Sequence, residues 1–400
     1  MRVMISCGEP SGDVYAGALA EALRARDPGV DIFGFGGPCL EAAGARLLGS
    51  FAGLSVTGLT EALRVLPQSA RMLRRLVDAA REFKPDVFVP IDFPDFNFRL
   101  MRSVRRLGTP IVYYISPQLW AWRPGRMHTM KQHVDKVLVI FPFEEQLYRD
   151  AGVPAEFVGH PLVDLTCITQ SRALLLRDHG LKPEAPTVAL LPGSRRNELQ
   201  RIAPTMAEAL PRIRARVPDV QFVVAAAPNL SHDLFEPFTG APERAPHNRR
   251  SDVAAASRRP VIIHGQTDDV LAACDLAVTA SGTATVQCAL HERPMVVVYR
   301  LSSLTYLLGK PFVKVDTYAM ANLVAGARVV PELIQEDFTA ERVAEEASAL
   351  LTDHDRYERT RRALAIVRHR LGEPGASGRA ADAVLAIARR GAKSASPRAP

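Results

Sequence analysis

Two consecutive series of short apolar runs, each followed by an amphipathic helical pattern, constrain the fold of this chain most. Such alternation is typical of βαβ units and therefore of parallel sheets covered by helices. The first series predicts strands at Val3–Cys7, Ile32–Phe35, Val87–Ile91, Ile111–Ile115, Lys136–Phe141 and Glu156–Val158. The second predicts strands at Thr187–Leu191, Gln221–Ala226, Val261–His264, Leu276–Thr279 and Met295–Tyr299. Helical patterns between them include Val14–Arg26, Gln68–Phe83, Glu198–Arg214, Thr283–His291 and Ala340–Leu351.

The two series predict an α/β protein with two Rossmann-like domains facing a cleft. A chain of 400 residues is too long for one ordinary core and suits two. We place the first domain at 1–165 and the second at 166–350. Helices in 351–390 are expected to pack back on the first domain or on a partner, and 391–400 is expected to be a disordered tail. Ligands in open α/β sheets bind at the carboxyl ends of the strands, so the loops there should carry the chemistry.

Composition narrows the class of protein. The formal charge of +7 favours anionic partners, such as phosphate-bearing substrates, acidic lipids or nucleic acid. The basic residues are spread along the chain without an aromatic-interleaved stripe, which argues against nucleic acid. The five cysteines are widely spaced and form no CxxC, so we expect a reducing cytoplasm and no zinc site. The N-terminus lacks a secretory signal pattern, and no run approaches the ~20 apolar residues that span a bilayer.

The loop after the first strand reads Gly8-Glu9-Pro10-Ser11-Gly12-Asp13 and opens a helix. Its backbone amides could face a bound group, which makes Glu9, Ser11 and Gly12 candidate site residues. The loop is not the GxGxxG of dinucleotide-binding proteins. A capped helix start, with Ser11 or Asp13 as the cap, accounts for the same residues.

Two acids, Asp92 and Asp95, follow the strand Val87–Ile91. An acid at the carboxyl end of a strand is well placed to act as a general base. In the alternative interpretation, Asp95 caps the following helix and Asp92 makes a structural hydrogen bond.

Both tryptophans of the chain, Trp120 and Trp122, lie in one loop with Arg123, after the strand Ile111–Ile115. These side chains fit a sugar or lipid pocket, and they also fit a loop anchored on the core.

Two loops of the second series are candidate phosphate cradles. One contains Gly193, Ser194 and Arg195, and the other consists of Ser281, Gly282, Thr283 and Ala284. Backbone amides at a helix N-terminus, together with an arginine, suit a diphosphate. Each loop alone fits an ordinary capped helix, whereas both in one domain favour a nucleotide diphosphate. A third loop, His264-Gly265, also ends a strand, and we predict no metal at this histidine or at His160.

Leu59, Leu63 and Leu66 recur at helical spacing, close to Arg64, Arg71, Arg74 and Arg75. They fit an ordinary helix packed on the core. They also fit an exposed apolar patch with a basic fringe that touches an anionic membrane. Glu61 and Pro67 argue against one long amphipathic helix here.

Taken in order over roughly residues 3–335, these segments resemble the lipid-A-disaccharide synthase family. The Trp-Ala-Trp-Arg block at 120–123 and the Pro-Gly-Ser-Arg block at 192–195 are the most specific matches. The other matching blocks are Gly8–Asp13, Gly36–Pro38, Lys84–Asn97, Ser116-Pro117, Pro142–Glu144, Gly159–Pro161, Ser281–Ala284, Pro294–Arg300, Asn322-Leu323 and Ala325-Gly326.

The resemblance implies an inverting, metal-independent glycosyltransferase of the GT-B fold that uses no cofactor. It implies transfer of 2,3-diacylglucosamine from UDP-2,3-diacylglucosamine to 2,3-diacylglucosamine 1-phosphate, which gives the β-1,6-linked disaccharide 1-phosphate and UDP. It further implies a cytoplasmic protein, peripheral on the inner face of the inner membrane, with the Leu59–Leu66 stretch facing the lipid. We also expect a homodimer, in which the C-terminal helices could exchange with the partner.

By matching positions, the resemblance implies a general base, a donor site and an acceptor site. The base would be Asp92. The donor or UDP site would hold Gly193, Ser194, Arg195, Gly265, Ser281, Gly282, Thr283, Ala284, Gln287 and Asn322. The acceptor side would hold Glu9, Ser11, Gly12, Asp95, Trp120, Trp122 and Arg123.

One departure from the family pattern bears on the donor site. Gln287 stands where the family commonly has a glutamate that plausibly holds ribose hydroxyls, although an amide also forms hydrogen bonds. Two other functions remain open: another UDP-sugar enzyme on this fold, such as an epimerase or a transferase with a different acceptor, and a non-catalytic binding module. The presence of both Asp92 and Arg195 argues against the second.

Overall fold

The computed structural model describes residues 1–51, 59–119, 125–228, 230–240, 259–301 and 317–395, with side chains except at 59–65 and 391–395. The predicted site residues Trp120, Trp122 and Arg123 lie outside this description. The chain divides into two compact units. The first comprises Met1–Asp164 and Leu371–Pro400, and the second comprises Leu165–Pro311 and Val315–Arg370.

All strands of the first unit are parallel and follow the order β3-β2-β1-β4, then β5-β6-β7. Bridges between Phe88 and Ile111 and between Ile91 and Tyr114 join β4 to β5, so the two groups form one continuous sheet. The strands are β1 (Arg2–Ser6), β2 (Asp31–Gly36), β3 (Arg46–Ser50), β4 (Val87–Pro90), β5 (Val112–Tyr114), β6 (Lys136–Val139) and β7 (Ala155–Phe157).

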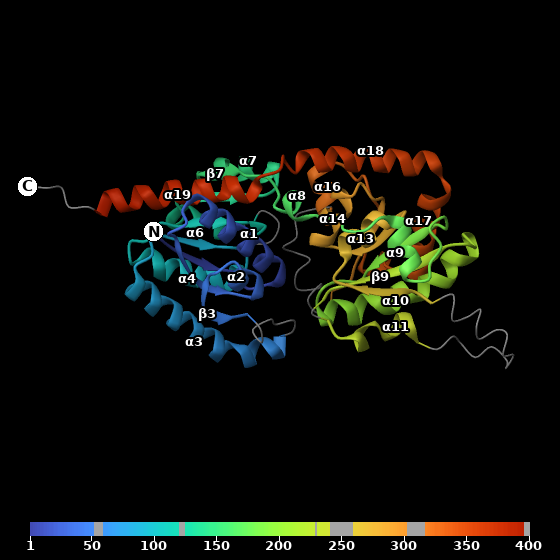
Figure 1. Ribbon diagram of the computed structural model, residues 1–400, viewed down its shortest axis with the longest axis horizontal. Coiled ribbons are helices and arrows are strands. Elements are labelled where there is room, and N and C mark those ends of the chain that lie inside the picture. Colours follow the sequence, from blue (N-terminus) through green and yellow to red (C-terminus); the bar gives the residue numbers. More distant parts are fainter. Residues whose placement is uncertain (52–58, 120–124, 229, 241–258, 302–316, 396–400) are drawn as a thin grey trace, which may run out of the picture. The chain divides into compact units, whose positions relative to one another are not determined.

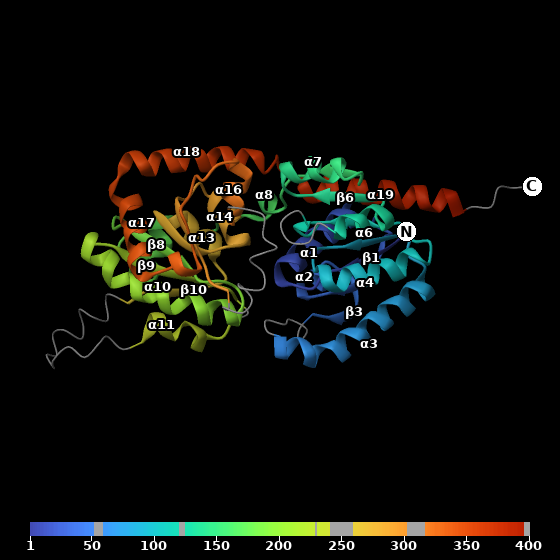
Figure 2. The same cartoon turned by 180° about the vertical axis from the view of Figure 1, so that it is seen from behind.

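Helices cover both faces of this sheet. Met4, Phe33 and Phe88 point to one face, where they share a core with side chains of α3, α4 and α6. On the other face α1 and α19 lie side by side, although they come from opposite ends of the chain (Figures 1 and 2). The helices are α1 (Pro10–Arg26), α2 (Pro38–Ala42), α3 (Leu59–Phe83), α4 (Pro94–Arg105), α6 (Arg126–His133), α7 (Pro142–Asp150), α8 (Leu162–Leu165, at the end of the unit) and α19 (Ala376–Ala395).

The second unit repeats the arrangement, with parallel strands in the order β10-β9-β8-β11-β12-β13. Its strands are β8 (Thr187–Leu191), β9 (Gln221–Ala226), β10 (Val261–His264), β11 (Leu276–Ala280), β12 (Met295–Tyr299) and β13 (Glu332–Ile334). One face packs on α10 and α17. The helices are α9 (Arg172–Asp178), α10 (Arg196–Arg216), η1 (His232–Phe235), α11 (Glu236–Thr239), α13 (Thr267–Ala273), α14 (Thr283–Leu290), α16 (Met320–Ala325), η3 (Gln335–Asp337), α17 (Ala340–Thr352) and α18 (His354–Arg370).

The second unit therefore has the doubly wound strand order 3-2-1-4-5-6 of the Rossmann fold, and the first unit has the same order with a seventh strand at its edge, which confirms the predicted fold class. In this topology the chain leaves the first and the fourth strand in opposite directions. The loops at the carboxyl ends of these two neighbouring strands form a switch point, where ligands bind. The switch points lie after β1 and β4 in the first unit and after β8 and β11 in the second.

The structure differs from the sequence predictions in four elements. The sequence missed β3 and β13, which are short strands at the edges of their sheets and carry no long apolar run. The helix predicted from Gln68 begins at Leu59 and continues across Pro67, because one proline removes one intrahelical hydrogen bond without ending the helix here. The last helix runs to Ala395 rather than ending at Arg390, whereas 396–400 lie outside the described residues.

The two C-terminal helices belong to different units. α18 packs on α14, α16 and α17, whereas α19 packs on α1 and against β4 and β5. Arg26 of α1 and Asp382 of α19 form a bidentate ion pair that ties the ends of the first unit together.

A buried histidine in the first unit predicts a specific pH dependence of stability. His160 is enclosed by the rings of Tyr15 and Phe141, and its Nδ1 accepts a hydrogen bond from the amide of Leu162. Burial lowers the pKa of His160 to about 3. Between pH 6.5 and 3 the unfolded chain binds a proton that the folded chain excludes. The contribution of the neutral His160 to the free energy of unfolding is therefore fully present above pH 6.5, and it falls by about 1.4 kcal/mol for each pH unit below that value.

We expect this loss to amount to about 2 kcal/mol at pH 5. Urea unfolding of the wild type and of His160→Gln at pH 7.5 and pH 5.0 measures it. The loss of unfolding free energy between the two pH values is compared between the two proteins, because the other titrating groups contribute equally to both. A variant that loses as much stability on acidification as the wild type does would contradict the assignment.

Candidate active site

The first switch point places Asp92 directly after β4. Asp92 and Phe93 both have left-handed backbone conformations, with φ of +42° and +50°. The amide of Asp92 donates to the carbonyl of Ile115 at 3.1 Å, which links the end of β4 to the end of β5. The side chain of Asp92 is half-buried, and Pro94 starts α4 immediately afterwards. A carboxylate therefore lies at the carboxyl edge of the sheet, as the sequence predicted.

The loop after β1 lies at the same switch point. Glu9 is the N-cap of α1, without a side-chain capping bond, and Ser11 and Gly12 occupy the first turn. Glu9 and Ser11 are half-buried, whereas Gly12 is buried. The prediction that Ser11 or Asp13 caps this helix is wrong, because Pro10 starts the helix and brings Asp13 to the buried side.

Asp13 caps a different helix, α2. It is 2% exposed, and its carboxylate accepts hydrogen bonds from the amides of Gly37 at 2.7 Å, Cys39 at 2.8 Å and Leu40 at 3.2 Å. These amides belong to the N-cap and the first turn of α2, which follows β2, so Asp13 joins the loop after β1 to the segment after β2.

Asp95 lies in the first turn of α4 and forms an ion pair with Arg126 of α6. The guanidinium of Arg126 also lies 5.1 Å from the centre of the Phe98 ring. Asp95 is largely exposed, so it stands near Asp92 in the chain but in a more polar setting.

The second switch point presents the N-terminus of α10 after β8. Arg195 is the N-cap, and Ser194 and Arg195 are exposed. Glu198 folds back over this turn, since its Oε2 accepts from the amide of Ser194 at 3.2 Å and its Oε1 lies 3.7 Å from Arg195 Nη1. Gly193 has a φ of +123°, and a Cβ there would lie 2.7 Å from the Glu198 carboxylate, so this turn requires glycine.

The N-terminus of α14 follows β11 at the same switch point. Gly282 is the N-cap, Gly282 and Thr283 are exposed, and Ser281 and Ala284 are half-buried. The amide of Ser281 donates to Val298 on the neighbouring strand. Two helix N-termini with exposed first turns therefore lie at adjacent strand ends, which is the arrangement that an anionic group prefers.

Gln287 lies one turn further along α14 and faces an acid of α13. Its Nε2 lies 3.5 Å from Asp268 Oδ1, and the same oxygen lies 2.9 Å from His291 Nε2. The residues Thr283, Gln287 and His291 share a face of α14 because they are four positions apart. A carboxylate therefore lies beside the amide of Gln287.

Asn322 is 1% exposed, and its amide is fully engaged within the unit. Its Oδ1 accepts from the amides of Val329 and Val330, and its Nδ2 donates to the Val330 carbonyl and to Glu332. Glu332 also accepts from the amides of Tyr318 and Ala319, and the Tyr318 carbonyl accepts from the hydroxyl of Ser281. Asn322 is therefore connected to the α14 cradle through Glu332 and Tyr318.

Gly265 follows β10, away from the switch point at the outer side of the sheet. Its amide donates to the carbonyl of Ala226 at 3.0 Å, and its φ is +72°. The neighbouring His264 is exposed and its ring lies against Phe235 and His232. Among the residues that the structure describes, no group of three or more His, Cys, Asp or Glu side chains is arranged to hold a metal ion.

The predicted membrane patch lies on α3. Leu66 is 48% exposed, whereas the side chains of Leu59 and Leu63 lie outside the description. Arg71, Arg74 and Arg75 follow on the next turns and are exposed. Within the part of the chain that the structure describes, no helix is long and apolar enough to cross a bilayer.

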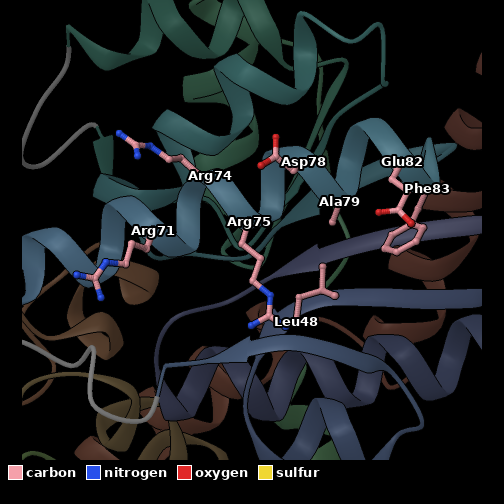
Figure 3. Close-up of a pocket in the computed structure, with 8 residues that line it drawn as sticks. All are labelled: Leu48, Arg71, Arg74, Arg75, Asp78, Ala79, Glu82 and Phe83. Atoms are coloured by element: carbon pink, nitrogen blue, oxygen red, sulfur yellow. The ribbon is translucent and has the colours of Figure 1, made fainter.

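A cavity of about 500 Å³ lies between this helix and the edge strand β3. Figure 3 shows Arg71 and Arg75 extending from α3 toward the side where Leu48 lies, whereas Arg74 and Asp78 extend to the other side. The remaining lining residues are Ala79, Glu82 and Phe83. The cavity carries both charge signs and contains none of the residues of the two switch points.

Sequence reasoning missed five polar residues that form hydrogen bonds at or beside the switch points. Asn97 and Tyr113 donate to the Asp92 carbonyl, and the other three are Asp13, Glu198 and Glu332. Some had a visible signal. Asn97 interrupts the apolar pair Phe96 and Phe98 in a buried helix, and Glu198 is an acid in the first turn of its helix. The partners of Asp13 and Glu332 are distant in sequence or in undetected elements, so no local pattern could reveal them.

The geometry supports one kind of chemistry. The first unit supplies a half-buried carboxylate at a switch point, and the second supplies two helix N-termini with an arginine. A carboxylate can accept a proton from a hydroxyl, and helix N-termini with a cation can stabilise charge on a departing phosphate.

Comparison with known proteins agrees with this chemistry. The family model for lipid-A-disaccharide synthetase matches residues 3–387. A lipid-A-disaccharide synthase from Myxococcus xanthus is 43% identical over 387 residues, which cover 96% of this chain and 97% of that protein. A second, from Syntrophus aciditrophicus, is 42% identical over 386 residues, with 96% and 97% coverage.

Solved structures with the same fold share little sequence. A UDP-GlcNAc 2-epimerase from Neisseria meningitidis bound to UDP-GlcNAc superposes with a TM-score of 0.67 at 11% identity, covering 96% of this chain and 100% of that one. A calicheamicin glycosyltransferase gives a TM-score of 0.58 at 17% identity, with 97% and 98% coverage. These likenesses concern the fold alone. The epimerase alternative is not favoured, because the family model and the similar sequences are those of lipid-A-disaccharide synthases. The chain belongs to the lipid-A-disaccharide synthetase family and is a UDP-sugar glycosyltransferase with the GT-B fold.

Proposed function

We propose that this protein transfers 2,3-diacylglucosamine from UDP-2,3-diacylglucosamine to the 6-hydroxyl of 2,3-diacylglucosamine 1-phosphate. The products are the β-1,6-linked disaccharide 1-phosphate and UDP. The observation that carries this proposal is that the first unit has a half-buried carboxylate, Asp92, at its switch point, and that the second unit has the helix N-termini of α10 and α14 at its own. The family membership gives the substrate class.

In the proposed mechanism Asp92 accepts the proton of the acceptor hydroxyl while the oxygen of that hydroxyl attacks C1 of the donor sugar. The bond between C1 and the β-phosphate oxygen breaks, and UDP leaves with the electron pair. Attack opposite to the leaving group inverts the anomeric centre, so no covalent enzyme intermediate is required. Arg195 and the first turns of α10 and α14 stabilise the charge that develops on the diphosphate.

Other residues of the second unit are assigned supporting roles in this proposal. Gln287 and Asp268 would receive the ribose hydroxyls, with the amide donating and the carboxylate accepting. Asn322 would act from behind the cradle, because its contacts with Glu332 fix the segment whose carbonyl holds Ser281. Gly265 would form part of the donor side without a side chain. On the first unit, Glu9, Ser11, Gly12 and Asp95 border the loops where the acceptor is proposed to bind.

The direct test is a defined reaction. Purified protein is mixed with both acylated substrates in detergent and a chelator, and the lipid products are followed by mass spectrometry. We expect a tetraacyl disaccharide 1-phosphate together with one UDP for each linkage. Conversion of the UDP-sugar alone into an isomer would instead indicate an epimerase. UDP binding without a disaccharide would indicate another acceptor.

Arg195→Ala tests the proposed donor site. We expect kcat/KM for the donor to fall roughly tenfold to a hundredfold, because a charge-assisted contact to the leaving diphosphate is lost. Arg196→Ala is the matched control, since Arg196 is the next residue, is also exposed, and its Nη2 lies 4.0 Å from Asp233 Oδ2. Equal losses in both variants would remove Arg195 from the donor site.

We further propose that the first unit binds the cytoplasmic face of the inner membrane through α3, with Leu59, Leu63 and Leu66 against the lipid. Arg71 and Arg75, which extend to the same side of α3, would face the anionic headgroups, each contributing roughly 1 kcal/mol near the surface. We expect flotation with phosphatidylglycerol vesicles to weaken several-fold in Arg71→Ala/Arg75→Ala and in high salt.

The double variant Arg359→Ala/Arg362→Ala serves as control, because it removes the same charge from exposed positions of α18 in the second unit. Binding that is insensitive to salt, or equally weakened in both double variants, would count against a basic membrane face on α3.

A further inference from the structure

The turn that carries Asp92 has a backbone conformation that its own sequence does not favour. Asp92 and Phe93 are consecutive residues with positive φ, and neither is glycine. Residues with a Cβ populate this region sparsely, Asp more often than Phe, and they do so as single residues rather than in succession. Contacts from outside the turn must therefore hold it, and such strain is concentrated at functional sites.

Two buried side chains hold the peptide group of Asp92 from within the first unit. The carbonyl oxygen of Asp92 accepts hydrogen bonds from Asn97 Nδ2 and from the hydroxyl of Tyr113, each at 2.8 Å. Asn97 and Tyr113 are both 0% exposed. They come from α4 and β5, so two elements converge on one carbonyl group.

Asn97 is itself fixed by the first strand of the sheet. Its Oδ1 accepts from the hydroxyl of Ser6 at 2.7 Å, and its Nδ2 lies 3.1 Å from the Ser6 carbonyl and 3.3 Å from the Ile91 carbonyl. The side chain thus joins the ends of β1 and β4 at the switch point. Its amide hydrogens are directed at three carbonyl groups, so its orientation is determined by the strands.

The next residue, Phe93, is locked by packing rather than by hydrogen bonds. Its ring stacks on Phe35 and Phe96, with centroids 6.4 Å and 5.4 Å away. A Cβ on Gly8 would lie 2.2 Å from this ring, so the loop after β1 leaves room for it only because residue 8 is glycine. The turn is enclosed on both sides.

We infer that Tyr113 and Asn97 are positioning residues that hold the Asp92 carboxylate in its working orientation by fixing the carbonyl of the same residue. This inference rests on the proposed role of Asp92 as the base. Burial, and then the nearby charge of Asp92, raise the pKa of the Tyr113 hydroxyl well above its usual value. The hydroxyl therefore stays protonated and donates throughout the working range of pH.

Tyr113→Phe is the decisive variant because it removes one hydroxyl and preserves the ring. Tyr114→Phe is its matched control: Tyr114 is the next residue of β5, is equally buried and lies on the opposite face of the sheet, close to Ser377. We expect Tyr113→Phe to lower kcat roughly fivefold to twentyfold, with KM for the donor and UDP affinity unchanged within twofold. Tyr114→Phe should keep kcat within twofold, and its thermal stability should stay close to that of the wild type, because the buried Tyr114 hydroxyl has no hydrogen-bond partner among the described residues.

The same substitution in the Asp92→Asn background separates positioning from general damage. If Tyr113 acts through Asp92, the double variant should turn over no more than about twofold slower than Asp92→Asn alone. Equal kcat losses in Tyr113→Phe and Tyr114→Phe, or fully additive losses in the double variant, would overturn the inference. Full activity of Asp92→Asn would instead refute the proposed base, and this outcome is read from the single variant alone.

Discussion

Asp92→Asn is expected to lower kcat by roughly 10²–10⁴ and to leave UDP binding within about twofold of the wild type. The amide keeps the size of the side chain but cannot accept the proton of the acceptor hydroxyl. Because the UDP cradle is proposed on the second unit, the loss should appear in turnover and not in donor affinity. Single-turnover rates and UDP titration calorimetry measure the two quantities separately.

The control for this variant is Asp86→Asn. Asp86 directly precedes the same strand at its amino end, where it accepts a hydrogen bond from the amide of Arg2 at 2.7 Å. We expect its kcat to stay within about threefold of the wild type, because the amino end of a parallel strand lies away from the switch point. Parallel losses of turnover and UDP affinity in Asp92→Asn would indicate a structural residue.

Asp13→Ala is expected to destabilise the first unit by about 3 kcal/mol or more. The substitution leaves three amide groups, the buried ones of Gly37 and Leu40 and the partly buried one of Cys39, without their acceptor. The helix that they begin, α2, has only five residues and cannot hold itself in water. The free energy of unfolding, from urea denaturation of the first-unit transition, is the quantity to measure.

Glu21→Ala on the exposed face of α1 is the matched control, and we expect a change within about 0.5 kcal/mol. Asp13→Asn should fall between the two, because one of its two polar atoms becomes a donor that faces an amide. An Asp13→Ala variant as stable as Glu21→Ala would show that water or a shifted loop replaces the carboxylate.

The strand pattern of the sequence predicted most of both sheets. Runs such as Thr187–Leu191 and Gln221–Ala226 are buried on both faces, so they are continuously apolar and coincide with β8 and β9. The edge strands β3 and β13 escaped because an edge strand buries less of its surface and needs fewer apolar residues. The position of Asp92 at a strand end was likewise predictable, because a strand end can be located from local hydrophobicity.

Partners could not be predicted in the same way. Asp13 was expected to cap its own helix, yet it caps α2, which begins 25 residues later in the chain. Asn322 was implied by resemblance to contact the donor, and the fold encloses its amide among Val329, Val330 and Glu332. Aspartate and asparagine side chains can form hydrogen bonds with many different groups, so sequence alone leaves the choice of partner open.

Local sequence thus determined where strands, helices and the chemically reactive loops occur, because hydrophobic period and turn residues act over a few positions. Only the tertiary structure decided that the loops after β1 and β4, and after β8 and β11, meet in pairs. It also decided that Asn97 and Tyr113 reach the carbonyl of Asp92 from α4 and β5. Such contacts depend on which strands lie side by side, and the order of strands in a sheet arises from long-range packing.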